Sequence, residues 1–506
     1  MLRWLLSLLL VALWFADARA QVEARSDNFR LVSEAPIDAT PILSDLEVFR
    51  AAVMTDLGLD PALRAPLTLT LTEDLEMFRD ITPGGITAGI YLQSAAGADI
   101  VVGYSDTPGH LLERALEPAW LRLVLRHEVV HHIMEAHYPR KVPIWLGEGL
   151  AEYYATFDAD ADGLAVFGRA LPEQGDLSAL ESWLPMRTVI ESMGRYPDYG
   201  AAGSQSLYAS QRLYYGQASA LARFVMNQPE GLARVEAFVE GLSEGRDSED
   251  SFESAFGLRF AALEARMRAG LSEDDALRVR ALDPPTARST TVLRLDPRTR
   301  DINRQRLLLS YGHKTERVAQ AIARRDAALP GDPQALHLAR ALNAWRRGDW
   351  DQSDTYAARV LARTPGEPRA LKLRAKTAYG RVSQDQTNEA LWADAEAAAL
   401  AALRAAPDDA RLHLFRVAVS LPESDRLPVA ALASLDWLQG RDVRLRLPHE
   451  AMMMIPALIY EGRFDRADAV LDNAARWTED PADLFVIERL RDNVRAERAR
   501  RAALGR

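Results

Sequence analysis

The sequence predicts an α+β fold followed by an all-α region. Short strand-like runs gather between residues 29 and 104, and helical patterns fill nearly all of the chain from about residue 111 onward. Strands that come first, with helices after them, are typical of α+β proteins. Beyond residue 330, proline-led segments recur with a period of about 35 residues, which is typical of stacked helical hairpins.

The first twenty residues, MLRWLLSLLLVALWFADARA, predict a signal peptide. Arg3 precedes an apolar run from Trp4 to Ala16, and Ala18-Arg19-Ala20 has the small-x-small pattern of a cleavage site. The run is shorter than the ~20 residues of a membrane-spanning helix, and an uncleaved anchor is the alternative. We expect export across an inner membrane into a bacterial periplasm, with no membrane span after cleavage.

Composition excludes several classes of function. The formal net charge of -11 argues against general affinity for nucleic acid. The chain has no cysteine, so it has no disulfide framework, no thiol nucleophile and no thiolate metal ligand.

The expected small mixed sheet belongs to an α/β part at about residues 27–110. Its strands are predicted by short β-rich runs, with the helical stretch ILSDLEVFRAAVMTDLG between the first two. These runs are FRLVS from Phe29, LTLTLT at Leu67 to Thr72, GIYL at Gly89 to Leu92 and DIVVGY at Asp99 to Tyr104.

The rest of the chain divides into three predicted parts. A helical part at about residues 111–280 completes a domain at 21–282. Residues 283–301 carry three prolines and many small polar residues, which predicts a linker with a short extended piece. Residues 302–506 then form the helical region with the recurring segments.

The recurring segments include PGDPQALHLARALNAW and PGEPRALKLRAKTAYG. Four residues have the spacing of a helical hairpin: a small residue where the helices touch (Ala341), a turn (Gly348), an aromatic residue that opens the second helix (Trp350) and a proline that ends it (Pro365). The region therefore resembles tetratricopeptide repeats, which implies a surface for a protein partner or substrate segment. A generic α-helical domain is the alternative.

Four of the nine histidines lie in RHEVVHHIMEAH, within a run from Leu121 to Ala136 that lacks proline and glycine. His127 and His131 are one helical turn apart, so both imidazoles are expected on one face. Glu128 lies beside the pair, where it can take a proton from metal-activated water without being a ligand. His132 and His137 are expected to be surface or packing histidines.

A catalytic zinc site needs a third protein ligand. After the prolines that end this helix, IWLGEGLAEYY restarts a helical pattern and presents Glu148 and Glu152 on one face. Glu148 is the expected third ligand. Glu152, one turn further, is expected to accept the free N–H of a ligand imidazole.

His-Glu-x-x-His followed by WLGEGLAEY resembles the gluzincin metallopeptidases, and specifically the peptidase-MA-like proteins with C-terminal repeats. The resemblance spans about residues 29–271 and implies a small sheet leading into a helical zincin lobe. It implies Zn²⁺ bound by His127, His131 and Glu148, and Glu128 as general base and acid. It also implies that Glu152 orients a ligand imidazole.

The same resemblance implies a tyrosine that stabilises the oxyanion. LYYGQASALARFV offers Tyr214 and Tyr215, and Tyr215-x-x-Ala is similar to a gluzincin aminopeptidase segment. Tyr215 is the preferred candidate for this role, and Tyr214 remains a second candidate. The alternative is that both side chains simply pack in the core. The Gly-x-Met-Glu-Asn motif is absent, which argues against aminopeptidase activity.

The sequence therefore predicts a secreted zinc metallopeptidase that acts on a peptide or protein substrate. The alternative is a periplasmic scaffold or interaction protein whose zinc peptidase domain is latent or weakly active.

Overall fold

We describe the protein from a computed structural model. Its described residues are 21–62, 65–82, 88–105, 113–137, 142–159, 164–169, 183–192, 204–243, 246–269, 278–281, 290–420, 427–440, 448–476, 478 and 480–503. The predicted signal peptide lies outside the described residues. The chain forms two compact units: unit 1 is Met1–His137, Phe157–Ala165 and Arg280–Leu373, and unit 2 is Tyr138–Thr156, Val166–Val279 and Arg374–Arg506.

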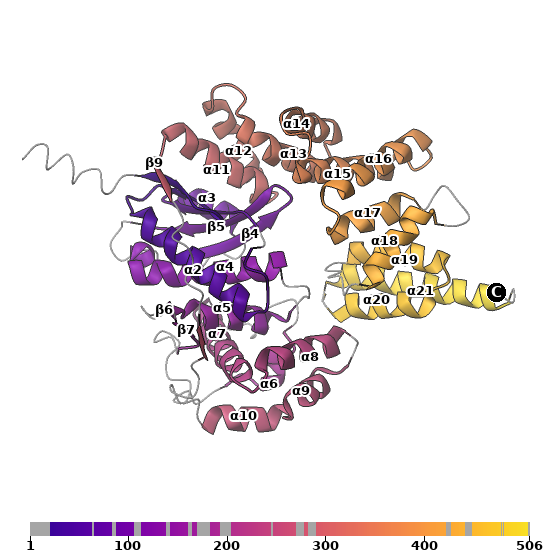
Figure 1. The fold of residues 1–506 in the computed structure, drawn as a ribbon. Coiled ribbons are helices and arrows are strands. Elements are labelled where there is room, and N and C mark those ends of the chain that lie inside the picture. Colours follow the sequence, from indigo (N-terminus) through magenta and orange to yellow (C-terminus); the bar gives the residue numbers. More distant parts are fainter. Residues whose placement is uncertain are drawn as a thin grey trace, which may run out of the picture. The chain divides into compact units, whose positions relative to one another are not determined.

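A six-stranded mixed sheet lies at the centre of unit 1, in the order β4-β5-β3-β2-β1-β9 (Figure 1). β3 pairs in parallel with β2 and β5, whereas β1 with β2, β1 with β9 and β4 with β5 pair antiparallel. The predicted combination of helices with a mixed sheet is confirmed. The strands are β1 (Val22–Arg25), β2 (Phe29–Ser33), β3 (Leu67–Thr72), β4 (Gly89–Ser94), β5 (Gly97–Gly103) and β9 (Thr291–Arg294).

The interior strand β3, LTLTLT, is covered on both faces. Its leucines are fully buried, and so are Thr70 and Thr72 on the other face. A buried hydroxyl needs a hydrogen-bond partner. Thr70 Oγ1 accepts a 3.0 Å bond from Asn303 Nδ2, and Thr72 Oγ1 donates a 2.8 Å bond to Glu34 Oε2. The alternating pattern therefore encodes two different buried faces here.

Helices pack on both sides of the sheet in unit 1. Four of the helices in unit 1 begin with aspartate caps, at Asp38, Asp74, Asp296 and Asp349. For example, Asp38 Oδ1 accepts from Thr40 N, and Asp296 Oδ2 accepts from Thr299 N. The helices and short 3-10 turns of unit 1 are α2 (Ala39–Asp56), α3 (Leu75–Ile81), η2 (Glu113–Leu116), α4 (Pro118–His137), α11 (Pro297–Tyr311), α12 (Glu316–Ala328), η6 (Gln334–Leu336), α13 (His337–Arg346) and α14 (Trp350–Arg363).

Strand β4 separates two of these helices. A Cβ built on Gly89 would clash with Val124 of α4, whereas Ile90 and Leu92 pack into a cluster with Leu307 and Leu308 of α11. Successive side chains point to opposite faces of a strand, so α4 and α11 lie on opposite faces of the sheet at β4.

A second, three-stranded sheet in the order β6-β7-β8 falls in the stretch expected to be almost wholly helical. Its strands are two to four residues long and give no periodic pattern in the sequence. They are β6 (Asp158–Ala159), β7 (Leu164–Phe167) and β8 (Arg278–Ala281).

The C-terminal helices of unit 2 have amphipathic spacing. In α20, Ala467, Val470, Leu471 and Ala474 are buried at positions i, i+3, i+4 and i+7. They pack in one core with residues of α17 to α21. The remaining helices are α5 (Ile144–Ala155), α6 (Met186–Ile190), α7 (Ser204–Met226), α8 (Gly231–Ser243), α9 (Ser248–Phe256), α10 (Phe260–Ala269), α15 (Pro368–Gln384), α16 (Glu389–Ala405), α17 (Ala410–Val419), α18 (Val429–Gly440), α19 (Pro448–Tyr460), α20 (Phe464–Arg476) and α21 (Pro481–Ala503).

Within the described ranges, none of the helices combines the length and apolar character needed to span a membrane.

Candidate metal centre

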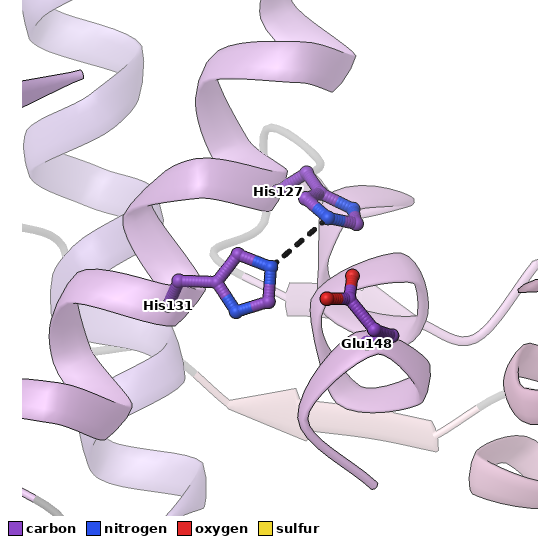
Figure 2. A group of neighbouring side chains, drawn as sticks. All are labelled: His127, His131 and Glu148. Atoms are coloured by element: carbon purple, nitrogen blue, oxygen red, sulfur yellow. Dashed lines mark hydrogen bonds between the residues drawn. The ribbon is translucent and has the colours of Figure 1, made fainter. Parts of the chain in front are cut away.

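Helix α4 presents the two imidazoles of the His-Glu-x-x-His motif. Its buried stripe includes Leu121, Leu125, Val129 and Ile133, which fixes the face that packs inward. His127 and His131 are half-buried, and their Nε2 atoms are 3.1 Å apart (Figure 2). The expected positions of these two side chains on one face are confirmed.

Helix α5 supplies a carboxylate to the same group. Pro143 precedes its first residue, where a missing N–H costs nothing, and the N–H of Ile144 donates to the Ser192 carbonyl at 3.0 Å. Glu148, in the second turn, is half-buried. Its carboxylate oxygen and the nitrogens of His127 and His131 all lie within 4.8 Å of one another.

These three donors could hold a metal ion, and the spacing of the two histidines suits zinc. Zinc bonds of ~2.0–2.1 Å in a tetrahedral site place the ligand atoms about 3.3 Å apart. The 3.1 Å separation of the histidine nitrogens is close to that value. Two imidazoles and one carboxylate are the ligand set of many catalytic zinc sites, and they leave a fourth position open.

Glu128 is buried and turned toward the sheet. Its Oε2 accepts a 2.7 Å hydrogen bond from the backbone N–H of Tyr91 on β4. The same tyrosine's hydroxyl lies 3.3 Å from Nδ1 of His132, one turn further along α4. Sequence reasoning did not identify Tyr91, because nothing in the GIYL run indicates which amide meets the helix.

His132 is a packing histidine, as expected. Its Nε2 lies 2.9 Å from the carbonyl oxygen of Ala65, which can only accept, so Nε2 carries the proton and Nδ1 accepts from Tyr91. Burial lowers the pKa of His132 from 6.5 to about 4, and nearby His137 and Arg50 act in the same direction. Burial also lowers the pKa of His137. His132 is therefore neutral at pH 7.

Helix α7 crosses α5 at the residue after Glu148. A Cβ on Gly149 would lie 2.5 Å from the carbonyl oxygen of Ala218 and 2.9 Å from the Cβ of Ala222. Only glycine permits this close approach of the two backbones. Tyr215 is one turn before Ala218 on α7, so the crossing brings its part of the helix toward the Glu148 end of α5.

The two candidate tyrosines have different surroundings. Tyr214 is fully buried, and its hydroxyl is hydrogen-bonded to Ser192 Oγ. Tyr215 is half-buried, with its ring roughly perpendicular to that of Tyr214. These differences favour Tyr215 as the more accessible phenol, and its role at the oxyanion stays a prediction.

Glu152 lies one turn beyond Glu148 on α5 and is half-buried. Its predicted support of a ligand imidazole also stays a prediction.

No protein-family model and no curated protein matches this chain. The resemblance to gluzincins therefore rests on the motifs themselves and on the grouping of their side chains.

Proposed function

We propose that the protein is a zinc-dependent peptidase of the gluzincin type. The observation that supports this most is the grouping of His127, His131 and Glu148, two imidazoles and a carboxylate brought together from separate helices. Glu128 lies between the two histidines in sequence, as a general base of this class requires. Zinc, when bound, supplies Lewis acidity that acidifies water and polarises a carbonyl group.

In the proposed reaction, Glu128 is both base and acid. Its carboxylate takes a proton from the attacking water as the oxygen adds to the peptide carbonyl carbon. It then gives that proton to the leaving amine as the carbon–nitrogen bond breaks. One water is consumed, and a carboxylic acid and an amine are released.

Tyr215 is proposed to donate a hydrogen bond to the oxyanion that develops during this attack. Glu152 is proposed to fix the orientation of a ligand imidazole.

The position of β4 supports an extended peptide substrate. β4 is the terminal strand of the six-stranded sheet among the described residues, and it lies against Glu128. A peptide that added to such an edge would be held by backbone hydrogen bonds, independent of most of its side chains.

We further propose that the protein is exported to the periplasm and that the C-terminal helices are tetratricopeptide-like hairpins that bind a protein partner or substrate segment. The signal-like N-terminus and the proline-led period support these two points. α13 and α14 follow each other around Gly348, whose φ of +76° suits the tight turn of such a hairpin.

The test combines metal analysis with cleavage of a diverse peptide pool. Wild-type protein should bind one zinc per chain and cleave peptides. Glu128→Gln should keep the metal and the hydrogen bond from Tyr91 N, because the amide oxygen still accepts, and should lose cleavage by at least about a hundredfold. Glu135→Gln, the same substitution on the same helix, is the matched control and should remain active.

Glu148→Gln should weaken metal binding. Metal without any cleavage would contradict a peptidase and favour the scaffold alternative. No bound metal would contradict the zinc site itself.

A further inference from the structure

Strand β4 packs against α4 on one face and against helices from the later part of the chain on the other. On one face, Tyr91 contacts Glu128 and His132 of α4. On the other face, Ile90 and Leu92 pack with side chains of α3, α11 and α12. The strand that bonds Glu128 therefore lies between α4, the helix that carries His127 and His131, and a layer formed by α3, α11 and α12.

Tyr311, the last residue of α11, contacts both strands of the β4–β5 hairpin. Its hydroxyl oxygen is 2.8 Å from Oδ2 of Asp99 and 3.0 Å from the carbonyl oxygen of Gly97 on β5, and 3.3 Å from the carbonyl oxygen of Leu92 on β4. Leu92 directly follows Tyr91. A single hydroxyl thus lies one residue away from the amide that bonds Glu128.

A buried ion pair fixes the same helix to the sheet. The guanidinium of Arg306 on α11 makes a two-point contact with the fully buried carboxylate of Asp99, at 2.8 and 2.5 Å. A bidentate pair of this kind sets both distance and orientation. α11 is therefore fixed in register against β5, and Tyr311 is fixed with it.

The tip of the β4–β5 hairpin contacts the next helices. Ala95 and Ala96 pack against a cluster from α13, α14 and α15 that contains Leu342, Ala357 and Leu373. The carbonyl oxygen of Ala96 accepts a 3.1 Å hydrogen bond from Nη1 of Arg369. The first C-terminal helical hairpin thus binds a segment of its own chain.

We propose that helices α11 to α15 position the catalytic carboxylate of Glu128. Tyr311 is the main positioning residue, and it acts on Glu128 through β4. The path runs from the Tyr311 hydroxyl, which donates to Asp99, across the pairing of Asp99 with Leu92 to β4. From Leu92 it continues to the adjacent Tyr91 amide and to Oε2 of Glu128. This inference rests on the proposed peptidase function for its kinetic readout, but its structural readout is independent of any activity.

The test uses Tyr311→Phe in the full-length protein, which removes one oxygen and keeps the ring. The expected result is a fall in kcat of about tenfold, the size of one lost hydrogen bond, with KM and zinc content unchanged. Amide hydrogen exchange in residues 89–94 should become about tenfold faster, while exchange in β3, residues 67–72, stays the same. Tyr379→Phe on α15, a phenol that packs against Phe415, is the matched control and should change neither quantity.

If Tyr311→Phe fails to fold, Arg369→Gln serves instead. It removes an exposed side chain's bond to the hairpin tip, and a smaller change in the same two readouts is expected. An unchanged kcat, or exchange that rises equally in β3 and β4, would overturn the inference. Absence of cleavage by the wild type would contradict the proposed function alone, and the exchange of β4 would then decide whether these helices hold the strand.

Discussion

A methyl group on Gly149 would approach the carbonyl oxygen of Ala218 to 2.5 Å. Helices α5 and α7 therefore meet backbone to backbone, at the residue that follows the proposed ligand Glu148. Contact at this distance leaves no room for a side chain, since packed interiors have few gaps that could absorb one.

Gly149→Ala is expected to destabilise the protein by about 1–3 kcal/mol, because the helices must separate to accept the methyl group. Thermal unfolding measures this. Gly147→Ala is the control within the same helix: among the described residues its methyl group would approach Val142 alone, at 3.8 Å, and helix propensity favours alanine. An equal change in Tm for the two variants would contradict the close crossing of α5 and α7.

Tyr215→Phe and Tyr214→Phe should separate catalysis from stability. Loss of the Tyr215 hydroxyl is expected to lower kcat by about tenfold to a hundredfold, because it removes the proposed hydrogen bond to the oxyanion. Loss of the Tyr214 hydroxyl breaks the bond to Ser192 and should lower stability by about 1 kcal/mol. A kcat loss confined to Tyr214→Phe would reverse the assignment.

The stability of the metal-free protein should depend on pH through His132. Its pKa is about 4 when folded, against 6.5 in an ordinary environment, so the unfolded chain binds more protons between these values. The contribution of His132 to the free energy of unfolding is fully present above pH 6.5. It is lost as the pH falls toward 4, by an amount on the order of 3 kcal/mol.

His132→Gln keeps an N–H for the Ala65 carbonyl and has no titration in this range. Chemical denaturation of both proteins at several pH values, after chelation of metal, measures the difference. The variant should lose less stability than the wild type between pH 6.5 and 4, and parallel curves would contradict the buried neutral imidazole.

The Asp99–Arg306 pair predicts a large effect of a single truncation. Asp99→Ala leaves the largely buried guanidinium of Arg306 without its carboxylate partner and should lower the free energy of unfolding by about 3–5 kcal/mol. Asp492→Ala breaks the exposed pair with Arg495 and should leave Tm unchanged. Similar changes in Tm for Asp99→Ala and Asp492→Ala would show that Asp99 is solvated rather than buried.

Much of the sheet could be predicted because β2 to β5 carry their pattern locally. LTLTLT and the runs beside it are rich in β-branched and apolar residues, and each forms a strand. β1, VEAR, was not predicted: it has two charged residues in four, and it becomes a strand through pairing with β2 and β9.

The predicted linker at residues 283–301 contains β9 and the start of α11. The expected extended piece lies at β9, but its partner strand could not be inferred, since strand pairing between distant segments is not encoded in local sequence. The helix start had a local signal, because Asp296-Pro297 is a capping residue followed by a first-turn proline.

The grouping of His127, His131 and Glu148 could be predicted from the sequence, whereas the surroundings of Glu128 could not. Helical spacing brings His127 near His131, and motif order suggests Glu148, so these residues could be found from the sequence. Tyr91 could not, because which backbone amide reaches Glu128 depends on the register of β4 against both β5 and α4.

The pairing of β1 with β9 has a consequence for how the protein is made. Val22 lies opposite Arg294 and Arg25 opposite Thr291, so the sheet receives its last strand only after the ribosome has passed residue 294. Until then β1 has an unpaired outer edge, which is a surface on which other strands can add. A chain ended near residue 282 would keep that edge permanently, and we expect such a fragment to aggregate rather than to behave as an isolated domain.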